Sequence, residues 1–328
     1  MTDFNSNKIF EIKNEIDFLN CSLELFNYQY TNCNIYKKYC ITRNCNPNNV
    51  LTLDSIPFLP IQFFKRFPII NKNKKPQIEF TSSGTTSSNR STHYISDVSI
   101  YRTSFLKGFT KFYGNVSDYC FLALLPSYLE RDGSSLVFMV SELIKQTKQN
   151  GSGFYLNNHE ELFNMIKKNE LDNIKTILIG VSFALITFSE KYRFPLKNTI
   201  IMETGGMKGH GKEIPREDLH LLFKSAFSLQ NIHSEYGMTE LLSQAYAQKN
   251  GHFKTPSWMK VLVRDTNDPL SLIPDGKTGG INIIDLANFN SCSFLALQDL
   301  GKINGDGTFE VLGRFDFSDL RGCNLMVD

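Results

Sequence analysis

The stretch that decides the fold is residues 176–204, which read TILIGVSFALITFSEKYRFPLKNTIIMET. Its two ends, 176–181 and 199–204, are short apolar runs of the length and composition typical of buried strands. Similar runs lie further out at 77–80 and 120–125, and helical patterns lie at 97–112, 134–147, 160–168 and 216–227. Because strands and helices alternate, we expect an α/β fold with a doubly wound, mostly parallel sheet covered on both faces.

The chain changes character on both sides of this region. Upstream, apolar residues recur at steps of three and four, which predicts one helix over 8–30 with a single buried face: Ile9, Ile12, Ile16, Leu19 and Leu23. Segment 56–65, IPFLPIQFFK, predicts an extended packed connector, and 65–75, with five basic residues, predicts a solvated loop. Downstream of Trp258 we expect strands at 259–264, 280–284, 293–297 and 309–312. The expected parts are an N-terminal helical segment and connector (1–75), an α/β core (76–258) and a β-rich C-terminal subdomain (259–328).

Composition excludes several classes of protein. The 328 residues include 35 Lys plus Arg and 33 Asp plus Glu, so a net charge of +2 gives no general attraction to nucleic acid. The longest nearly apolar run, 177–188, is shorter than the roughly 20 residues of a membrane span. Residues 1–20 carry acids and lack the apolar core of a signal peptide, so we expect a cytoplasmic protein whose seven cysteines are reduced. The cysteine spacing does not match a zinc site.

A hydroxyl-rich loop carries the first chemical signal. Residues 80–90 read FTSSGTTSSNR, in which a strand candidate ends in serines and threonines around one glycine. Hydroxyls and exposed backbone N–H groups can surround phosphate oxygens, and Arg90 adds a planar cation. A plain solvated loop is the alternative, and the Gly-Lys-Ser/Thr ending of a Walker loop is missing.

Three further motifs follow along the chain. Gly205 and Gly206 come directly after a strand candidate, where open α/β sheets bind ligands, although a simple turn explains them equally. The run HSEYGMTE at 233–240 offers an aromatic face, a hydroxyl and a hard oxygen ligand for Mg²⁺, while a helix start at Thr239 is the alternative. Asp299 suits a ribose diol and Arg314 a phosphate. His233 is a candidate for an acyl pocket, whereas His93 and His220 are interpreted as structural or exposed.

The order of these motifs resembles that of the adenylate-forming superfamily of acyl- and aryl-CoA ligases. With the segments at 56–65, 125–131, 232–241 and 320–325, the chain from Ile56 to Val327 is similar to the LuxE-type acyl-protein synthetase family. The resemblance implies ATP and Mg²⁺ as cofactors, with Thr239 on the α-phosphate, Glu240 on Mg²⁺ and Tyr236 stacked on adenine. It also implies Asp299 on the ribose and Arg314 at the ribose–phosphate edge. The remaining nucleotide-binding residues would be Ser82, Ser83, Gly84, Thr85, Thr86, Arg90, Gly205 and Gly206.

The chain departs from longer relatives at two places. Ser87 stands where relatives usually carry Gly, and the printed sequence ends at Asp328, so we expect it to lack their small C-terminal domain with its catalytic Lys. Arg90, Lys208 and Lys212 are open candidates for the cation that assists adenylation. LuxE-type synthetases resemble this chain in carrying an acylated Cys near the C-terminus, which implicates Cys323; a buried structural thiol is the alternative. Arg321 beside it would favour the thiolate.

The resemblance implies an ATP-dependent ligase. It would join a carboxylic acid, expected to be a fatty acid, to AMP and pass the acyl group to a protein thiol, with a reductase or carrier protein as the acceptor. One alternative is a stand-alone acyl-CoA or carrier-protein ligase, in which Cys323 is incidental. Another is a non-catalytic protein that binds acyl chains or nucleotide and modulates a partner reductase or acyltransferase.

Overall fold

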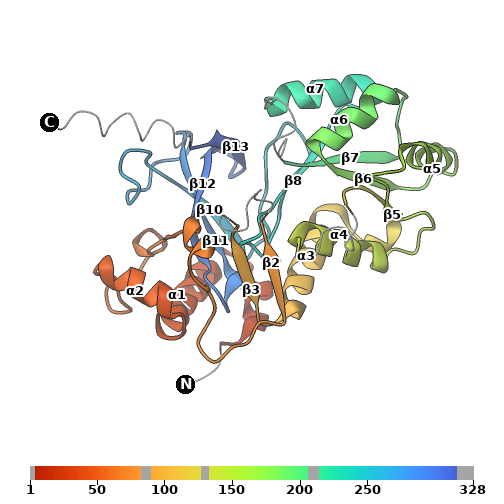
Figure 1. The fold of residues 1–328 in the computed structure, drawn as a ribbon. Helices are drawn as coiled ribbons and strands as arrows, with labels where there is room; N and C mark the ends of the chain where they lie inside the picture. The colour runs from red at the N-terminus through yellow and green to blue at the C-terminus, as the bar shows by residue number, and fades with distance from the viewer. Residues whose placement is uncertain (1–3, 83–89, 127–132, 206–213, 316–328) are drawn as a thin grey trace.

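The structure is a computed structural model that describes residues 4–82, 90–126, 133–205 and 214–315. Figure 1 shows two sheets, one covered by helices α3 to α7 and the other packed against the N-terminal helices α1 and α2. A two-stranded ladder, β2 (Ile78–Thr81) with β3 (Thr92–Ile95), lies between them. Nowhere in the described part of the chain is a helix both long and apolar enough to cross a membrane.

The larger sheet is the predicted α/β core. Its strand order is β5-β4-β6-β7-β8-β9, and every neighbouring pair is parallel except the last, which is antiparallel. Every residue of β4 and β6 is buried, as a parallel sheet with two covered faces requires. The fold-class prediction is confirmed. The strands are β4 (Cys120–Leu124), β5 (Gly153–Phe154), β6 (Thr176–Val181), β7 (Thr199–Thr204), β8 (His233–Tyr236) and β9 (Ala245–Ala247).

Helices cover both faces of this sheet, with α6 and α7 on one face and α3 and α4 on the other (Figure 1). Side-chain caps begin several of them; the Ser134 side chain, for example, accepts from the Val137 N–H. Helix α6 was not predicted, because an apolar run that follows a buried strand has no clear helical period. The helices are α3 (Val98–Tyr113), α4 (Ser135–Gln146), α5 (His159–Leu171), α6 (Ser182–Lys191) and α7 (Arg216–Phe227), with the short η5 (Val116–Asp118).

The second sheet is the predicted β-rich part, with one addition. Its order is β1-β12-β11-β10, and β13 pairs with β12. The expected connector contributes β1 (Leu59–Pro60), which pairs in parallel with β12, and then the short helix η3 (Ile61–Lys65). The prediction of a merely extended connector was therefore incomplete. The other strands are β10 (Met259–Arg264), β11 (Gly279–Asp285), β12 (Phe294–Ile303) and β13 (Phe309–Arg314), and η6 (Leu286–Asn288) follows β11.

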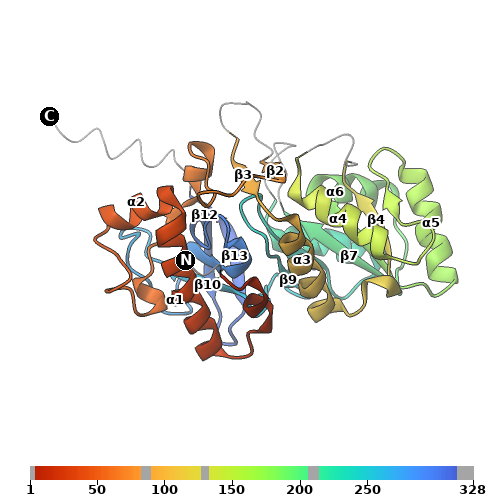
Figure 2. The same cartoon turned by 90° about the horizontal axis from the view of Figure 1, so that it is seen from below.

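The prediction of one helix over 8–30 was wrong. The segment folds as η1 (Ser6–Glu11) and α1 (Glu15–Asn32), followed by α2 (Asn34–Thr42) and η2 (Leu53–Ser55). Asn14 caps α1, its side chain accepting from the Asp17 N–H, so α1 begins as a separate helix and does not continue the residue spacing of η1. Ile16 is consequently 70% exposed, and the buried face instead contains Phe18, Leu25 and Phe26. Figure 2, seen from below, shows α1 and α2 against the second sheet.

Candidate functional site

A tyrosine, an aspartate and an arginine form a bonded cluster where the two sheets meet. Tyr236 ends β8, and its hydroxyl donates to Asp299 Oδ2 at 2.7 Å. Arg314 Nε donates to Asp299 Oδ1 at 2.9 Å. The side chain of Asp299 is only 6% exposed, whereas that of Arg314 is 71% exposed. The cluster therefore has a buried anion at its base and a solvent-facing cation at its rim.

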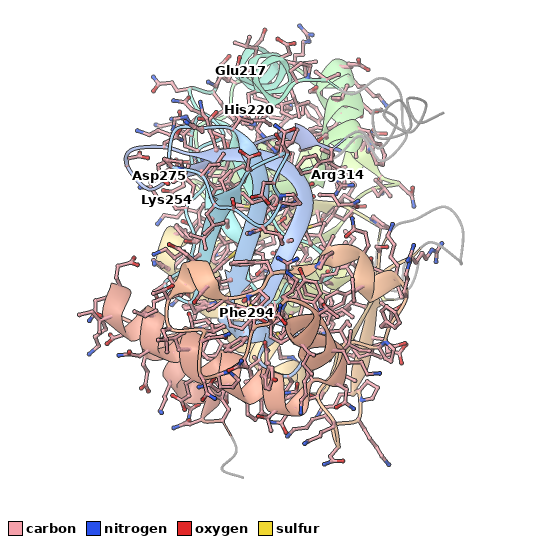
Figure 3. The ribbon with its side chains drawn as sticks, turned by 90° about the vertical axis from the view of Figure 1, so that its left-hand side faces the viewer. Glu217, His220, Lys254, Asp275, Phe294 and Arg314 are labelled. Atoms are coloured by element: carbon pink, nitrogen blue, oxygen red, sulfur yellow. The ribbon has the colours of Figure 1, made fainter. Side chains whose placement is uncertain are left out.

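Strand register explains why Asp299 and Arg314 meet. The two residues face each other in the antiparallel ladder of β12 and β13. The register shifts between Leu300 and Gly301, and a Cβ at Gly301 would lie 2.3 Å from the Glu310 backbone oxygen. Only glycine allows this close approach of the two strands. In Figure 3, Phe294, the first residue of β12, lies low in the view, Arg314, the last residue of β13, lies above it, and His220 lies higher still.

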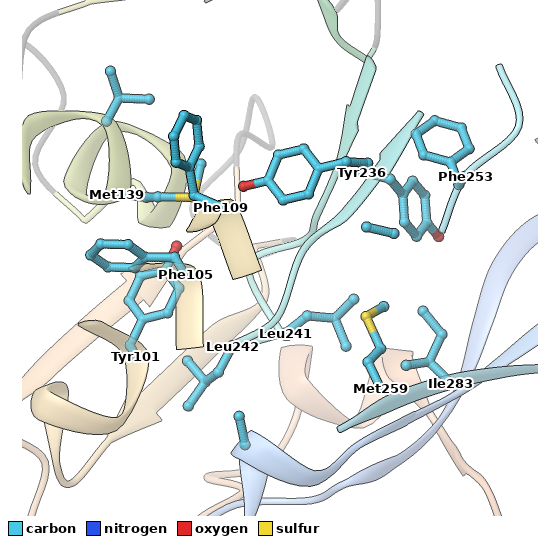
Figure 4. Packing of buried hydrophobic residues seen from close by; sticks show 14 of the residues in the cluster. Tyr101, Phe105, Phe109, Met139, Tyr236, Leu241, Leu242, Phe253, Met259 and Ile283 are labelled. Carbon is cyan, nitrogen blue, oxygen red and sulfur yellow. The ribbon is translucent and has the colours of Figure 1, made fainter. Parts of the chain in front are cut away.

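The ring of Tyr236 is part of the core. Its centroid lies 5.7 Å from those of Phe253 and Phe309. Figure 4 shows Tyr236 beside Phe253, with Met259 and Ile283 of the second sheet nearby. Burial, and next the Asp299 carboxylate, hold the pKa of Tyr236 well above its usual value. Tyr236 is therefore a neutral hydrogen-bond donor that fixes Asp299.

The carboxyl group of Glu240 lies close enough to this cluster for its charge and that of Arg314 to act on each other. Thr239 and Glu240 form a turn after β8, so the alternative of a helix starting at Thr239 was wrong. Glu240 is 5% exposed, and burial raises its pKa even though the Ser91 hydroxyl and the charges of Arg314 and Lys65 lower it. The turn thus holds a desolvated carboxyl group within the electrostatic field of two cations.

The backbone of this turn is fixed from behind by His93, whose role the sequence did not reveal. His93 Nδ1 lies 3.0 Å from the Thr239 carbonyl oxygen, and His93 Nε2 lies 2.9 Å from Ser291 Oγ. Burial lowers the pKa of His93 to about 4, so the ring is neutral. A neutral ring that donates from Nδ1 to Thr239 accepts at Nε2 from the Ser291 hydroxyl. Asn288 Nδ2 also donates to the Glu240 carbonyl oxygen at 2.7 Å.

A buried ion pair joins α7 to both sheets. Glu203, near the carboxyl end of β7, is 1% exposed and lies 3.1 Å from Arg216 Nε. Its Oε1 is also 3.7 Å from His220 Nε2, and Arg216 Nη1 donates to the Val311 carbonyl oxygen of β13. Burial alone would raise the pKa of Glu203, but the hydrogen bond with His220 and the charge of Arg216 have the larger effect and lower it overall, so the carboxyl group is ionised. His220 was predicted to be structural or exposed and is buried in this ion pair, whereas the pairing of Glu203 with Arg216 was not predicted.

The remaining predicted residues fall into two groups. Ser82 and Arg90 flank the end of the β2–β3 ladder, and Ser82 Oγ accepts from the Ser91 N–H at 2.9 Å. Gly205 is exposed directly after β7, with open space where a Cβ would lie. His233 bonds Tyr113 at 3.2 Å. Outside the described residues lie Ser83, Gly84, Thr85, Thr86, Gly206, Lys208, Lys212 and Cys323.

The described side chains would suit an Mg²⁺ ion that is held mainly by phosphate oxygens. Among the described residues, no three or more His, Cys, Asp or Glu side chains are grouped to hold a metal. A single carboxylate combined with phosphate oxygens and water is the usual protein environment of Mg²⁺. Glu240, a buried carboxyl group in the turn after β8, is the residue that would hold such an ion. The chemistry that Mg²⁺ would supply is charge neutralisation on phosphate oxygens.

Comparison with known proteins gives a clear result only for structures. No protein-family model and no curated protein matches the sequence. An open form of 2-hydroxyisobutyryl-CoA ligase in complex with 2-HIB-AMP and CoA is 12% identical, with a TM-score of 0.66 over 92% of this chain and 70% of that chain. ATP-bound MatB from Rhodopseudomonas palustris is 17% identical, with a TM-score of 0.52 over 72% of this chain and 47% of that chain.

O-succinylbenzoate coenzyme A synthetase (MenE) from Bacillus subtilis, in complex with AMP, is similar at 18% identity. Its TM-score is 0.51, over 72% of this chain and 49% of that chain. The chain therefore spans about half the length of the MatB and MenE structures. From the two-sheet architecture and these matches, the chain has the fold of the adenylate-forming acyl- and aryl-CoA ligases.

Proposed function

We propose that this protein is an ATP-dependent ligase that activates a carboxylic acid as its acyl-adenylate. The observation that carries the proposal is the cluster of Tyr236, Asp299 and Arg314 beside the buried Glu240 carboxyl. An anion fixed by two bonds suits the ribose hydroxyls, and an exposed cation suits a phosphate. The similar solved structures contain ATP, AMP or an acyl-AMP, which supports the same ligand here.

The proposed first step is a displacement at phosphorus. A carboxylate oxygen of the substrate attacks the α-phosphorus of ATP, a new P–O bond forms, and the bond to the bridging oxygen between the α- and β-phosphates breaks. Pyrophosphate leaves with the electron pair, and the acyl-adenylate remains. The turn at Thr239–Glu240 would hold the α-phosphate and Mg²⁺, because positioning and charge stabilisation supply most of the catalysis in such a step.

The proposed second step transfers the acyl group to a thiolate. The sulfur attacks the acyl carbon, AMP leaves, and a thioester forms. We propose Cys323 as the acceptor, before passage to a reductase or carrier protein, and a fatty acid as the substrate. Another cysteine, Cys292, is fully buried, and burial raises its thiol pKa well above the usual value, so it is a poor nucleophile.

Carboxylate-dependent exchange of labelled pyrophosphate into ATP tests the first step. We expect exchange with carboxylic acids of one range of chain lengths, and its absence with every acid would contradict the ligase proposal in favour of a non-catalytic binding protein. Glu240→Gln should lower the exchange rate and raise the Mg²⁺ concentration needed for half-maximal rate.

Hydroxylamine-labile labelling of the protein by radioactive acid tests the second step. Cys323→Ser should abolish labelling and keep the exchange, while the control Cys45→Ser, at a half-buried thiol, should keep both. The names of the similar ligases favour CoA as a second candidate acceptor. Free acyl-CoA formation that is unaffected by Cys323→Ser would select that alternative.

A further inference from the structure

The last residue of η3, Lys65, lies on the side of the molecule where β12 carries Asp299. Strand β1 pairs in parallel with β12, with Leu59 opposite Leu295 and Pro60 opposite Ala296. Because both strands run in the same direction, η3 continues alongside the part of β12 that leads to Asp299. Helix η3 contacts both β12 and β3. The sequence predicted Lys65 at the junction of the packed connector and the solvated loop, and the fold adds that η3 lies beside β12 and β3.

An aromatic contact anchors the end of η3 to the Thr239–Glu240 turn. Phe64 is 2% exposed, and its ring centroid lies 5.3 Å from that of His93 at an interplanar angle of 88°. His93 in turn is bonded to the Thr239 carbonyl oxygen. A buried ring therefore fixes the residue directly before Lys65 against the support of the turn.

Lys65 differs from the other cation near this turn. Its side chain is exposed, and it makes no ion pair with any residue in the described part of the chain. The charges of Arg314 and Lys65 both lower the pKa of the Glu240 carboxyl. Arg314 is already bonded to Asp299 at 2.9 Å. Lys65 therefore brings an ammonium group to the region of Glu240 without a carboxylate in direct contact with it.

We propose that the Lys65 ammonium binds phosphate oxygens of the nucleotide in this site. The inference rests on the proposed function and adds a cation from the N-terminal segment, where the sequence had offered Arg90, Lys208 and Lys212. The Glu240 carboxylate and a polyphosphate repel each other, and the positive charge of a lysine that acts on both reduces that repulsion. When the bond between the α- and β-phosphates breaks, the same ammonium stabilises the charge that develops on pyrophosphate. A lysine acts in this role as a compact point charge.

Calorimetric titration with ATP and with adenosine, in the presence of Mg²⁺, separates this role from a structural one. Lys65→Met should weaken ATP binding about 10- to 100-fold, the range for loss of a hydrogen bond to a charged group. Adenosine has no phosphate, so its affinity should stay within about twofold. Lys65→Arg should recover part of the ATP affinity. The control Lys74→Met removes an exposed charge in the same basic segment and should bind both ligands like the unmodified chain.

Two results would overturn the assignment of Lys65. One is ATP affinity in Lys65→Met that equals that of the unmodified chain. The other is an equal loss for ATP and adenosine, which indicates a change of shape rather than the loss of a phosphate contact. If the unmodified chain binds no ATP and supports no pyrophosphate exchange, the proposed function itself is wrong, and the role of Lys65 falls with it.

Discussion

His93→Gln should change how the free energy of unfolding depends on pH. In the folded protein His93 is fully buried between the Thr239 carbonyl oxygen and Ser291 Oγ, and burial lowers its pKa from 6.5 to about 4. In the unfolded chain the same ring titrates near pH 6.5. Below that pH the unfolded chain binds a proton that the folded chain refuses, so stability falls as the pH drops from about 6.5 to about 4.

The size of this effect follows from the two pKa values. A difference from 6.5 to about 4 corresponds to about 3 kcal/mol of stability lost across that interval. Glutamine does not titrate, so this component disappears in the variant. At pH 7 the variant should be less stable by about 2–3 kcal/mol, because two buried bonds are disturbed and the contact with Phe64 is lost. Near pH 4 the two proteins should be almost equally stable.

Urea unfolding at several pH values between 7 and 4, followed by fluorescence, measures both free energies. Burial, and next His220, also lower the pKa of His233 to about 4, so His233 too reduces stability as the pH falls. This contribution is the same in the unmodified chain and in the variant, and it cancels in the difference between their free energies of unfolding. Parallel stability curves for the two proteins over this range would refute the reasoning.

His93→Asn places an amide nearer to the Nδ1 position, so it should retain more of the pyrophosphate exchange rate than His93→Gln.

Three further changes test the cluster and its surroundings. Tyr236→Phe removes the hydrogen-bond donor to Asp299 and should lower the free energy of unfolding by about 2 kcal/mol. It should also raise the ATP concentration needed for half-maximal pyrophosphate exchange. An unchanged unfolding midpoint would contradict a contribution of this buried hydrogen bond to stability. Gly301→Ala should lower the free energy of unfolding by about 1–3 kcal/mol, because the added Cβ would collide with the Glu310 backbone. Gly305→Ala is the control: its Cβ would lie in open space, and the variant should unfold like the unmodified chain. Glu203→Gln should lower the free energy of unfolding by about 3 kcal/mol, because it leaves Arg216 and His220 without a buried carboxylate. Calorimetry should show an unfolding midpoint lowered by several degrees. An unchanged midpoint would mean that the ion pair does not contribute to stability.

The sequence by itself determined the alternation of elements and the local chemistry. Strands β6, β7 and β10 and helix α7 lie at the predicted residues, because apolar runs, caps and turn residues are local signals. Tyr236, Glu240, Asp299 and Arg314 were selected from the sequence, and the structure places them in one region. The roles of these residues toward ATP stay predictions, as does the division into three parts.

Tertiary structure alone decided which distant residues meet. The pairing of Asp299 with Arg314 depends on a one-residue register shift, and the position of Lys65 depends on β1 joining β12 from more than two hundred residues away. His93 looks like any core histidine until the fold sets it behind the Thr239 turn, and Ile16 fits a helical period that the Asn14 cap breaks. Periodicity and propensity are local, whereas strand register and packing between segments follow from the burial of apolar area across the whole chain.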